Sequence, residues 1–116
     1  MSARNSLLQA PPYEVEQALD RLGASLRTAR LRRGLTIQQT ADKIGTGPRA
    51  VTDAENGKPS AGIATYAGLL WAYDLLEGLY RLADPATDTA GAALAQSREP
   101  LRSRARKSGM AMSDDF

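Results

Sequence analysis

The side chains that carry out most enzyme chemistry are missing from this 116-residue chain, which contains no Cys and no His. Their absence excludes disulfides, thiolate or imidazole metal sites, Cys nucleophiles and His general bases. The carboxylate pair Asp114-Asp115 falls in a segment predicted to be flexible, where no burial or fixed geometry would tune a pKa. Gly45-Thr46-Gly47 is too short to cradle a phosphate. We therefore expect no enzyme, no metal and no cofactor.

The charged side chains are distributed unevenly along the chain. Residues 1–59 carry nine basic and six acidic side chains, residues 60–96 carry one and four, and residues 97–116 carry five and three. An acidic middle thus separates two basic ends, although the net charge of +2 alone does not establish a nucleic-acid partner. Because no apolar run is long enough for a signal sequence or a bilayer span, we expect a cytoplasmic protein with no membrane partner.

Apolar residues at helical spacing predict the elements that position these charges. Val15, Leu19, Leu22, Leu26 and Ala29 form the stripe of one buried helix face. Thr36-Ile37-Gln38-Gln39 has the form of a capping box, and Gly45-Thr46-Gly47 followed by Pro48 predicts a turn into another helix. Asp74 is the expected N-cap of the last helix. The predicted helices cover residues 13–33, 37–44, 48–55, 63–73 and 74–82.

No strand pattern or internal repeat is present, so the predicted fold class is all-α, with about five helices. We expect an extended N-terminal arm over residues 1–12 and a single domain over residues 13–85. A weakly helical to disordered, flexible C-terminal tail with basic residues is expected over residues 86–116.

Residues 22–82 resemble the Cro/cI-like, or XRE, helix-turn-helix family. The matching residues are Leu26, Arg30, Gly34-Leu35-Thr36, Ala41, Ile44-Gly45, Val51 and Glu55-Asn56-Gly57-Lys58. The resemblance implies a sequence-specific DNA-binding repressor. Its helix from Thr36 would cross the phosphate backbone, and its helix over residues 48–55 would enter the major groove of double-stranded DNA.

The resemblance also assigns DNA contacts by position in the motif. Pro48, Arg49 and Asp53 would face the bases, with the Arg49 guanidinium able to donate two hydrogen bonds to guanine N7 and O6. Asp53 would either accept a hydrogen bond from a cytosine amino group or position Arg49. The implied phosphate contacts are Thr36, Lys43, Thr46, Asn56, Gly57 and Lys58.

Two other positions have an architectural role in the resembled fold. Arg30 and Glu55 are expected to form a partly buried ion pair that links the first predicted helix to the end of the third. Ile37 departs from the family pattern, in which Gln is common at the start of the second helix, so one phosphate contact would be lost.

The last two predicted helices carry more apolar side chains than one buried face needs. A domain this small cannot bury them alone, so we expect a two-fold homodimer through these helices. A dimer would hold two recognition helices about 34 Å apart, one turn of DNA, and would read a palindromic operator. The expected interface residues are Leu69, Leu70, Trp71, Leu75, Leu76 and Leu79.

A narrower resemblance is to HipB-type antitoxins, which act beside HipA-like kinase toxins. It rests on residues 11–16, 22–30, 44–47, 70–72 and 82–85 and on the end of the chain. It implies a repressor of its own operon that also binds a HipA-like toxin kinase. The tail residues that could bind this partner, unless they form a solubilising segment or attract phosphates nonspecifically, are Arg102, Arg104, Arg106, Asp114, Asp115 and Phe116.

Two other functions fit the same residues. One is a stand-alone repressor of phage type that has no toxin. The other is a protein-interaction module that has kept the helix-turn-helix scaffold and lost DNA binding, as Ile37 and the modest charge of the first 59 residues would allow.

Overall fold

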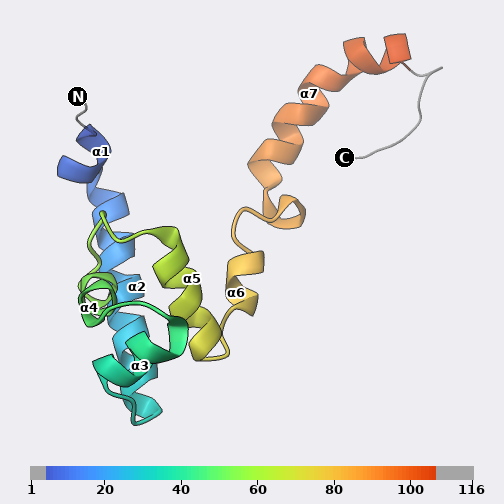
Figure 1. Cartoon of the computed structure of the whole chain (residues 1–116). Helices are drawn as coiled ribbons and strands as arrows, with labels where there is room; N and C mark the ends of the chain where they lie inside the picture. The colour runs from blue at the N-terminus through green and yellow to red at the C-terminus, as the bar shows by residue number, and fades with distance from the viewer. Residues whose placement is uncertain (1–4, 107–116) are drawn as a thin grey trace. The chain divides into compact units, whose positions relative to one another are not determined.

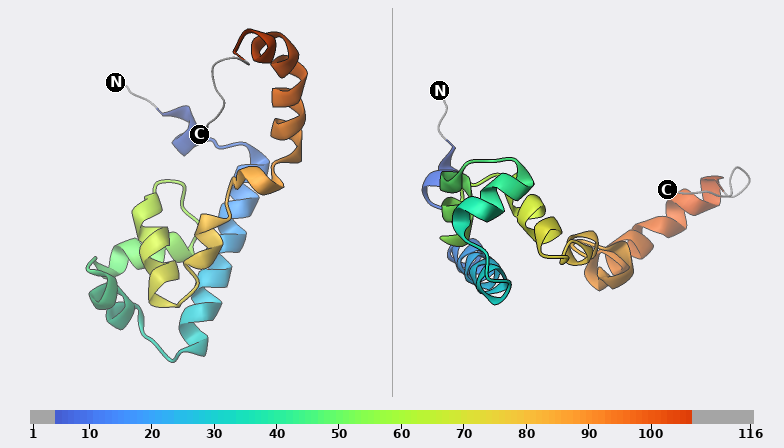
Figure 2. Two further views of the ribbon diagram at one scale, coloured as in Figure 1. Left: turned by 90° about the vertical axis from the view of Figure 1, so that its right-hand side faces the viewer. Right: turned by 60° about the horizontal axis from the view of Figure 1, so that its bottom comes forward.

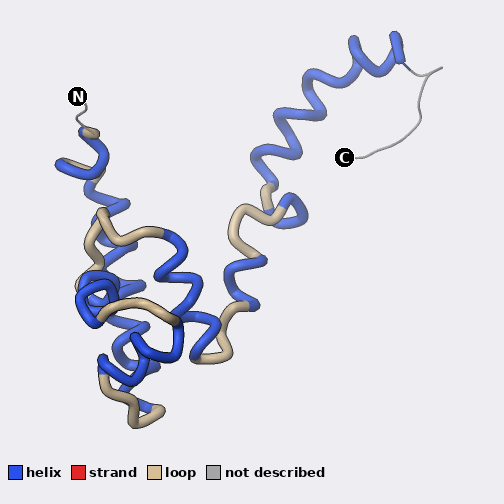
Figure 3. Tube along the Cα trace, in the orientation of Figure 1, coloured by secondary structure: helices blue, strands red, loops and turns tan. Residues whose placement is uncertain are grey.

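The computed structural model of the chain describes residues 5–106, with side chains up to residue 98, and every regular element in this range is helical (Figures 1 and 3). The all-α prediction is confirmed. The chain divides into two compact units, Met1–Leu79 and Tyr80–Phe116. The helices are α1 (Ser6–Gln9), α2 (Tyr13–Arg32), α3 (Ile37–Ile44), α4 (Pro48–Glu55), α5 (Ile63–Ala72), α6 (Glu77–Tyr80), the 3-10 turn η1 (Pro85–Thr87) and α7 (Thr89–Arg106).

The first unit is built around α4, which contacts α2, α3 and α5. Figures 1 and 2 show α3, α4 and α5 grouped beside the long helix α2. Four helices thus contribute to one core, to which α4 adds Val51 and Ala54 and leaves its opposite face to solvent. The buried apolar residues are Leu26, Ala29, Ala41, Val51, Ala54, Tyr66, Leu69 and Tyr73. Val15, which the spacing predicted on the buried stripe, is instead 40% exposed because it lies in the first turn of α2, away from this core.

Local signals fix the ends of α3 and the start of α4. The Gln39 N–H donates to Thr36 Oγ1 at 3.0 Å, and the Thr36 N–H donates to Gln39 Oε1 at 2.9 Å, which completes the capping box. Gly45 ends α3 with φ of 80°, and Pro48 is the first residue of α4. The observed bounds of both helices equal the predicted ones.

The prediction that Asp74 caps the last helix is wrong. Asp74 has φ of 63° and ends α5 instead, with its own N–H donating to Trp71 O and the Leu75 N–H donating to Leu70 O. This is the Schellman arrangement, in which a left-handed residue lets two N–H groups satisfy the last carbonyls of a helix. The chain therefore turns at Asp74, and only the four residues of α6 remain helical in the predicted 74–82 segment.

Helical structure outside the core exceeds the prediction at both ends. The arm contains the single turn α1, where the Leu7 N–H donates to the Asn5 side chain at 3.1 Å, and is not wholly extended. α7 has 18 residues where a weakly helical to disordered tail was expected. Its start is capped by Asp88, whose carboxylate accepts from the Gly91 N–H at 3.0 Å, and its first turns are rich in alanine, the strongest helix former.

Within the described residues, no helix is long and apolar enough to cross a lipid bilayer.

Candidate nucleic-acid interface

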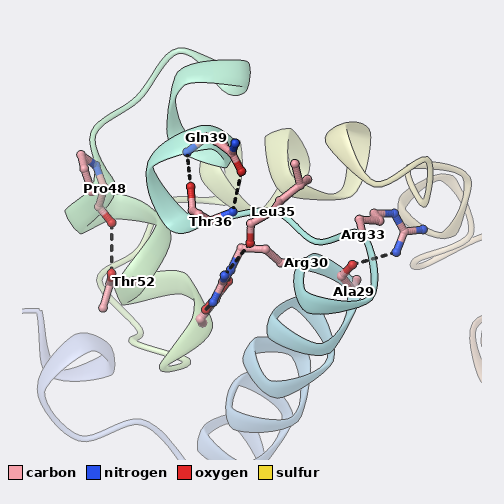
Figure 4. A network of polar contacts seen from close by, with 9 residues as sticks. Ala29, Arg30, Arg33, Leu35, Thr36, Gln39, Pro48 and Thr52 are labelled. Carbon is pink, nitrogen blue, oxygen red and sulfur yellow. Dashed lines mark hydrogen bonds and ion pairs between the residues drawn. The ribbon is translucent and has the colours of Figure 1, made fainter.

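The pair α3 and α4, joined by the turn at Gly45, presents the outer face of α4 to solvent. The Arg49 side chain is 84% exposed, and Pro48 beside it is also exposed. Thr52 lies on the next turn, but its hydroxyl donates to the Pro48 carbonyl at 3.1 Å and so turns back to its own helix (Figure 4). Arg49 is therefore the side chain of α4 best placed to reach a ligand outside the fold.

Asp53 links two cations on this face. Its Oδ1 lies 3.7 Å from Arg49 Nε and 3.4 Å from Lys58 Nζ, and its side chain is 24% exposed. The 3.7 Å separation is an ion pair that is longer than a hydrogen bond, so Arg49 is only loosely held. One carboxylate oxygen thus lies close to an exposed arginine of α4 and to a lysine from the loop after α4.

The backbone around Lys58 is fixed on both sides. The Lys58 N–H donates to Asp53 O and the Gly57 N–H donates to Ala54 O, both at 3.0 Å, with Gly57 at φ of 69°. These are the two bonds of a Schellman end, which places Lys58 over the last turn of α4. The Lys58 carbonyl in turn accepts from the Tyr66 hydroxyl at 3.3 Å. Burial raises the pKa of Tyr66, and the neighbouring Asp53 carboxylate raises it further, which keeps this hydroxyl a donor.

The end of α4 lies directly on the backbone of α2. A Cβ at Gly23 would come within 2.5 Å of Glu55 O and 2.7 Å of Ala54 O, and a Cβ at Gly57 would come within 2.7 Å of Leu19 O. Only glycine allows such an approach at both positions. Gly23 interrupts the apolar stripe of α2, and an isolated glycine inside such a stripe is itself a sign of close packing.

A buried ion pair holds the same helix end. Arg30 Nε donates to Glu55 Oε2 at 2.6 Å and Nη2 donates to Oε1 at 3.1 Å, while Nη1 donates to the Leu35 carbonyl at 2.8 Å (Figure 4). Both side chains are more than nine-tenths buried. The hydrogen bonds to Glu55 raise the pKa of Arg30 against the opposing effect of burial. The pair predicted from the resemblance is thus present, and it ties α2, the loop before α3 and α4 together.

A second arginine supports this arrangement and was not predicted. Arg33 Nη1 donates to the Ala29 carbonyl at 2.9 Å (Figure 4). Its Nη2 donates to the Tyr73 carbonyl at 2.8 Å. Its guanidinium also lies 5.5 Å from the centroid of the Tyr73 ring, within the range of a cation–π interaction. Arg33 thereby joins the ends of α2 and α5, and only the run of two arginines before Gly34 hinted at it.

The residues predicted to contact phosphates have different environments. Lys43, Asn56 and Lys58 are exposed, whereas Thr46 is half-buried and Thr36 uses its hydroxyl oxygen in the capping box. Gly57 is buried and its N–H bonds to Ala54, so we correct the expectation that its backbone contacts a phosphate.

The apolar residues predicted at a dimer interface do not lie on one surface. Leu69 is fully buried in the core and is not available to a partner, because it occupies the inner face of α5. Trp71 is 55% exposed and Leu75 is 43% exposed, while Leu70, Leu76 and Leu79 are half-buried. Leu75 also borders an open groove along α2, whose lining combines the small side chains of Ala24, Ser25, Thr28 and Ala29 with Arg32 and Arg33.

The predicted partner-binding residues fall partly within α7 and partly outside the described residues. Arg102, Arg104 and Arg106 belong to α7, but their side chains are not among those described. Asp114, Asp115 and Phe116 lie outside the described residues.

Residues 21–82, more than half of the chain, match the family described as helix-turn-helix domain. No curated protein and no solved structure matches the chain. The matched segment holds α3, the turn and α4 together with the part of α2 that docks them, which is the unit that places one helix in the major groove of DNA. The chain therefore belongs to the helix-turn-helix domain family, a family of DNA-binding regulators.

Proposed function

We propose that this protein is a sequence-specific transcriptional repressor that reads DNA with α4. The observation that carries the proposal is the exposure of Arg49 on a helix whose far end is held by the Arg30–Glu55 pair and by glycine contacts with α2. A guanidinium on a rigid helix can donate two hydrogen bonds to guanine in the major groove. Pro48 would pack beside it, and Asp53 would position it.

The phosphate contacts would come from the ends of the two helices. Thr36 and Thr46 lie at the start and end of α3, Lys43 lies on its last turn, and Asn56 and Lys58 follow α4. Such contacts fix the register of a protein on DNA and make binding salt-dependent, but they carry no sequence information.

Selection of binding sites from a random DNA library by the full chain tests this function. We expect an enriched sequence that contains guanine and binds more weakly as salt is raised. The Arg49→Ala variant should bind the selected site at least about fivefold more weakly, because a bidentate base contact contributes about 1–3 kcal/mol. Arg27→Ala is the matched control, since Arg27 is an exposed arginine of α2 outside the α3–α4 pair. Absence of any enriched sequence, or an equal loss in both variants, would contradict the proposal.

Binding as a homodimer is part of the proposal. Trp71 and Leu75 expose apolar side chains that a second copy would cover, and Leu70, Leu76 and Leu79 are half-buried. A dimer would make the selected site a palindrome with half-sites about 34 Å apart. Trp71→Glu should convert the dimer to a monomer in analytical ultracentrifugation, whereas Tyr80→Glu, at another exposed aromatic, should not. A wild-type protein that is monomeric at every concentration would refute the dimer.

The narrower proposal is an autoregulatory antitoxin for a HipA-like kinase. Its support is the resemblance of the sequence to HipB-type proteins. Copurification of a kinase polypeptide encoded beside this chain, with operator binding that changes when the kinase is added, is the expected result. Retention of DNA binding without any kinase partner would favour a stand-alone repressor instead.

A further inference from the structure

Asp53 interacts both with the residue proposed to contact bases, Arg49, and with a residue proposed to contact a phosphate, Lys58. Its Oδ1 is shared by Arg49, which faces the bases in the proposed function, and by Lys58, which would face a phosphate. The two cations come from different elements, one from α4 and one from the loop after it. A change at one of them therefore alters the electrostatic field felt by the other through a single oxygen.

The backbone hydrogen bonds of Lys58 hold its main chain close to Asp53, so Lys58 and Arg49 both interact with the same Asp53 Oδ1. The Lys58 N–H and carbonyl are both hydrogen-bonded, to Asp53 O and from the Tyr66 hydroxyl, so its main chain is held while the side chain is 47% exposed. Among the described residues, the 3.7 Å contact to Asp53 is the one polar contact that restrains the Arg49 side chain, which is 84% exposed. In the free protein the Asp53 carboxylate thus forms ion pairs with both Lys58, whose main chain is held, and Arg49, whose side chain is loosely held.

We propose that Asp53 is a positioning residue that couples phosphate contact by Lys58 to base reading by Arg49. This inference rests on the proposed function. When the Lys58 ammonium moves to a DNA phosphate, the Asp53 carboxylate interacts with Arg49 alone and holds its Nε. The two terminal nitrogens of the guanidinium are then directed outward, where guanine N7 and O6 accept. Backbone docking in the correct register thereby orders the arginine that reads the sequence.

The coupling requires that Asp53 reduce nonspecific binding as well. A carboxylate beside two cations lowers the attraction of this face for any phosphate, and it repels DNA on which Arg49 finds no guanine. Replacement of Asp53 by Asn should therefore strengthen binding to random DNA and weaken discrimination. A merely structural residue would lower binding to both kinds of DNA together.

A double-mutant cycle in two backgrounds tests the proposal. Dissociation constants of full-length Arg49→Ala, Lys58→Ala and the double variant are measured by fluorescence anisotropy, with Asp53 and with Asp53→Asn. The probes are the DNA selected by the wild type and a scrambled duplex of the same composition. Lys43→Ala replaces Lys58→Ala in a control cycle, because it removes the same charge from an exposed position on α3. Circular dichroism melts identify variants that are unfolded, and Asp53→Ser replaces Asp53→Asn if the latter does not fold.

We expect the effects of Arg49→Ala and Lys58→Ala on the selected site to be non-additive by about fivefold. This coupling should disappear in the Asp53→Asn background, on scrambled DNA and in the Lys43 control cycle. Coupling that persists without the carboxylate, or additivity in the wild-type background, would overturn the role of Asp53 while leaving DNA recognition by Arg49 intact. A wild-type chain that does not distinguish the two probes would overturn this inference and the proposed function together.

Discussion

Replacement of Gly23 by alanine tests how α4 is held against α2. A methyl group at this position would lie 2.5 Å from Glu55 O and 2.7 Å from Ala54 O, both closer than carbon and oxygen approach without repulsion. Both neighbours are backbone atoms of α4, so no side-chain rotation relieves the overlap. The last turn of α4 would have to move away from α2.

The effect of Gly23→Ala on the free energy of unfolding combines two opposing contributions. Alanine is favoured over glycine in a helix interior by roughly 1 kcal/mol, whereas overpacking costs about 1–3 kcal/mol and occasionally more. Because two carbonyl oxygens are overlapped at once, we take the upper end of that range and expect a net loss of about 2 kcal/mol in the free energy of unfolding. For a domain of this size, the midpoint of thermal unfolding should fall by about 8–16 °C.

Urea unfolding monitored by circular dichroism gives this free energy, and DNA binding at a temperature where the variant is folded reports the position of α4. Gly78→Ala is the matched control: Gly78 lies in α6, and its added Cβ would contact nothing within 4 Å. The control should be neutral or slightly stabilising. A Gly23→Ala variant as stable as the control would refute the close approach of α2 to α4.

Three further perturbations address the other supports of this unit. Arg30→Ala leaves the buried Glu55 carboxylate without its partner and should lower the free energy of unfolding by about 3–5 kcal/mol in the same urea assay. The double variant Arg30→Met plus Glu55→Leu should recover much of this loss. Asp74→Gly should raise stability by about 0.5–1 kcal/mol, since glycine adopts φ of 63° without the strain of a side chain; a loss would show that the aspartate side chain stabilises this turn. Burial raises the pKa of Tyr66 and Tyr73 above the ordinary 10.0, so the unfolded state releases their protons at a lower pH than the folded state. The free energy of unfolding should therefore decline as pH rises above 10.0, and it should decline less steeply in the Tyr66→Phe and Tyr73→Phe variants. Equal slopes in wild type and variants would exclude tyrosine ionisation as the cause.

Helices α3 and α4 could be predicted from the sequence because the signals that fix their ends are local. The capping box at Thr36, the glycine after Ile44 and the proline at the first position of α4 each act within a few residues, and together they fix both helices. The Arg30–Glu55 pair joins distant parts of the chain and could be anticipated only through the family resemblance.

Features that depend on tertiary contact could not be predicted in this way. Asp is a common residue at the start of a helix, so the sequence alone favours Asp74 as an N-cap. Asp74 ends α5 instead because the Leu75 N–H reaches the Leu70 carbonyl. Leu69 and Leu70 are adjacent and equally apolar, so the sequence does not show which one α5 turns toward the core. The role of Gly23 becomes visible only when α4 lies against it.

The central claim, that Arg49 on α4 reads guanine in the major groove, is tested most directly by removing the acceptor from the DNA. Each guanine of the selected site is replaced in turn by 7-deazaguanine, which lacks N7, and the dissociation constant is measured for the wild type and for Arg49→Ala. We expect one guanine whose replacement weakens wild-type binding by about fivefold or more and leaves binding of the variant unchanged. An equal loss for both proteins at every guanine would contradict base reading by Arg49.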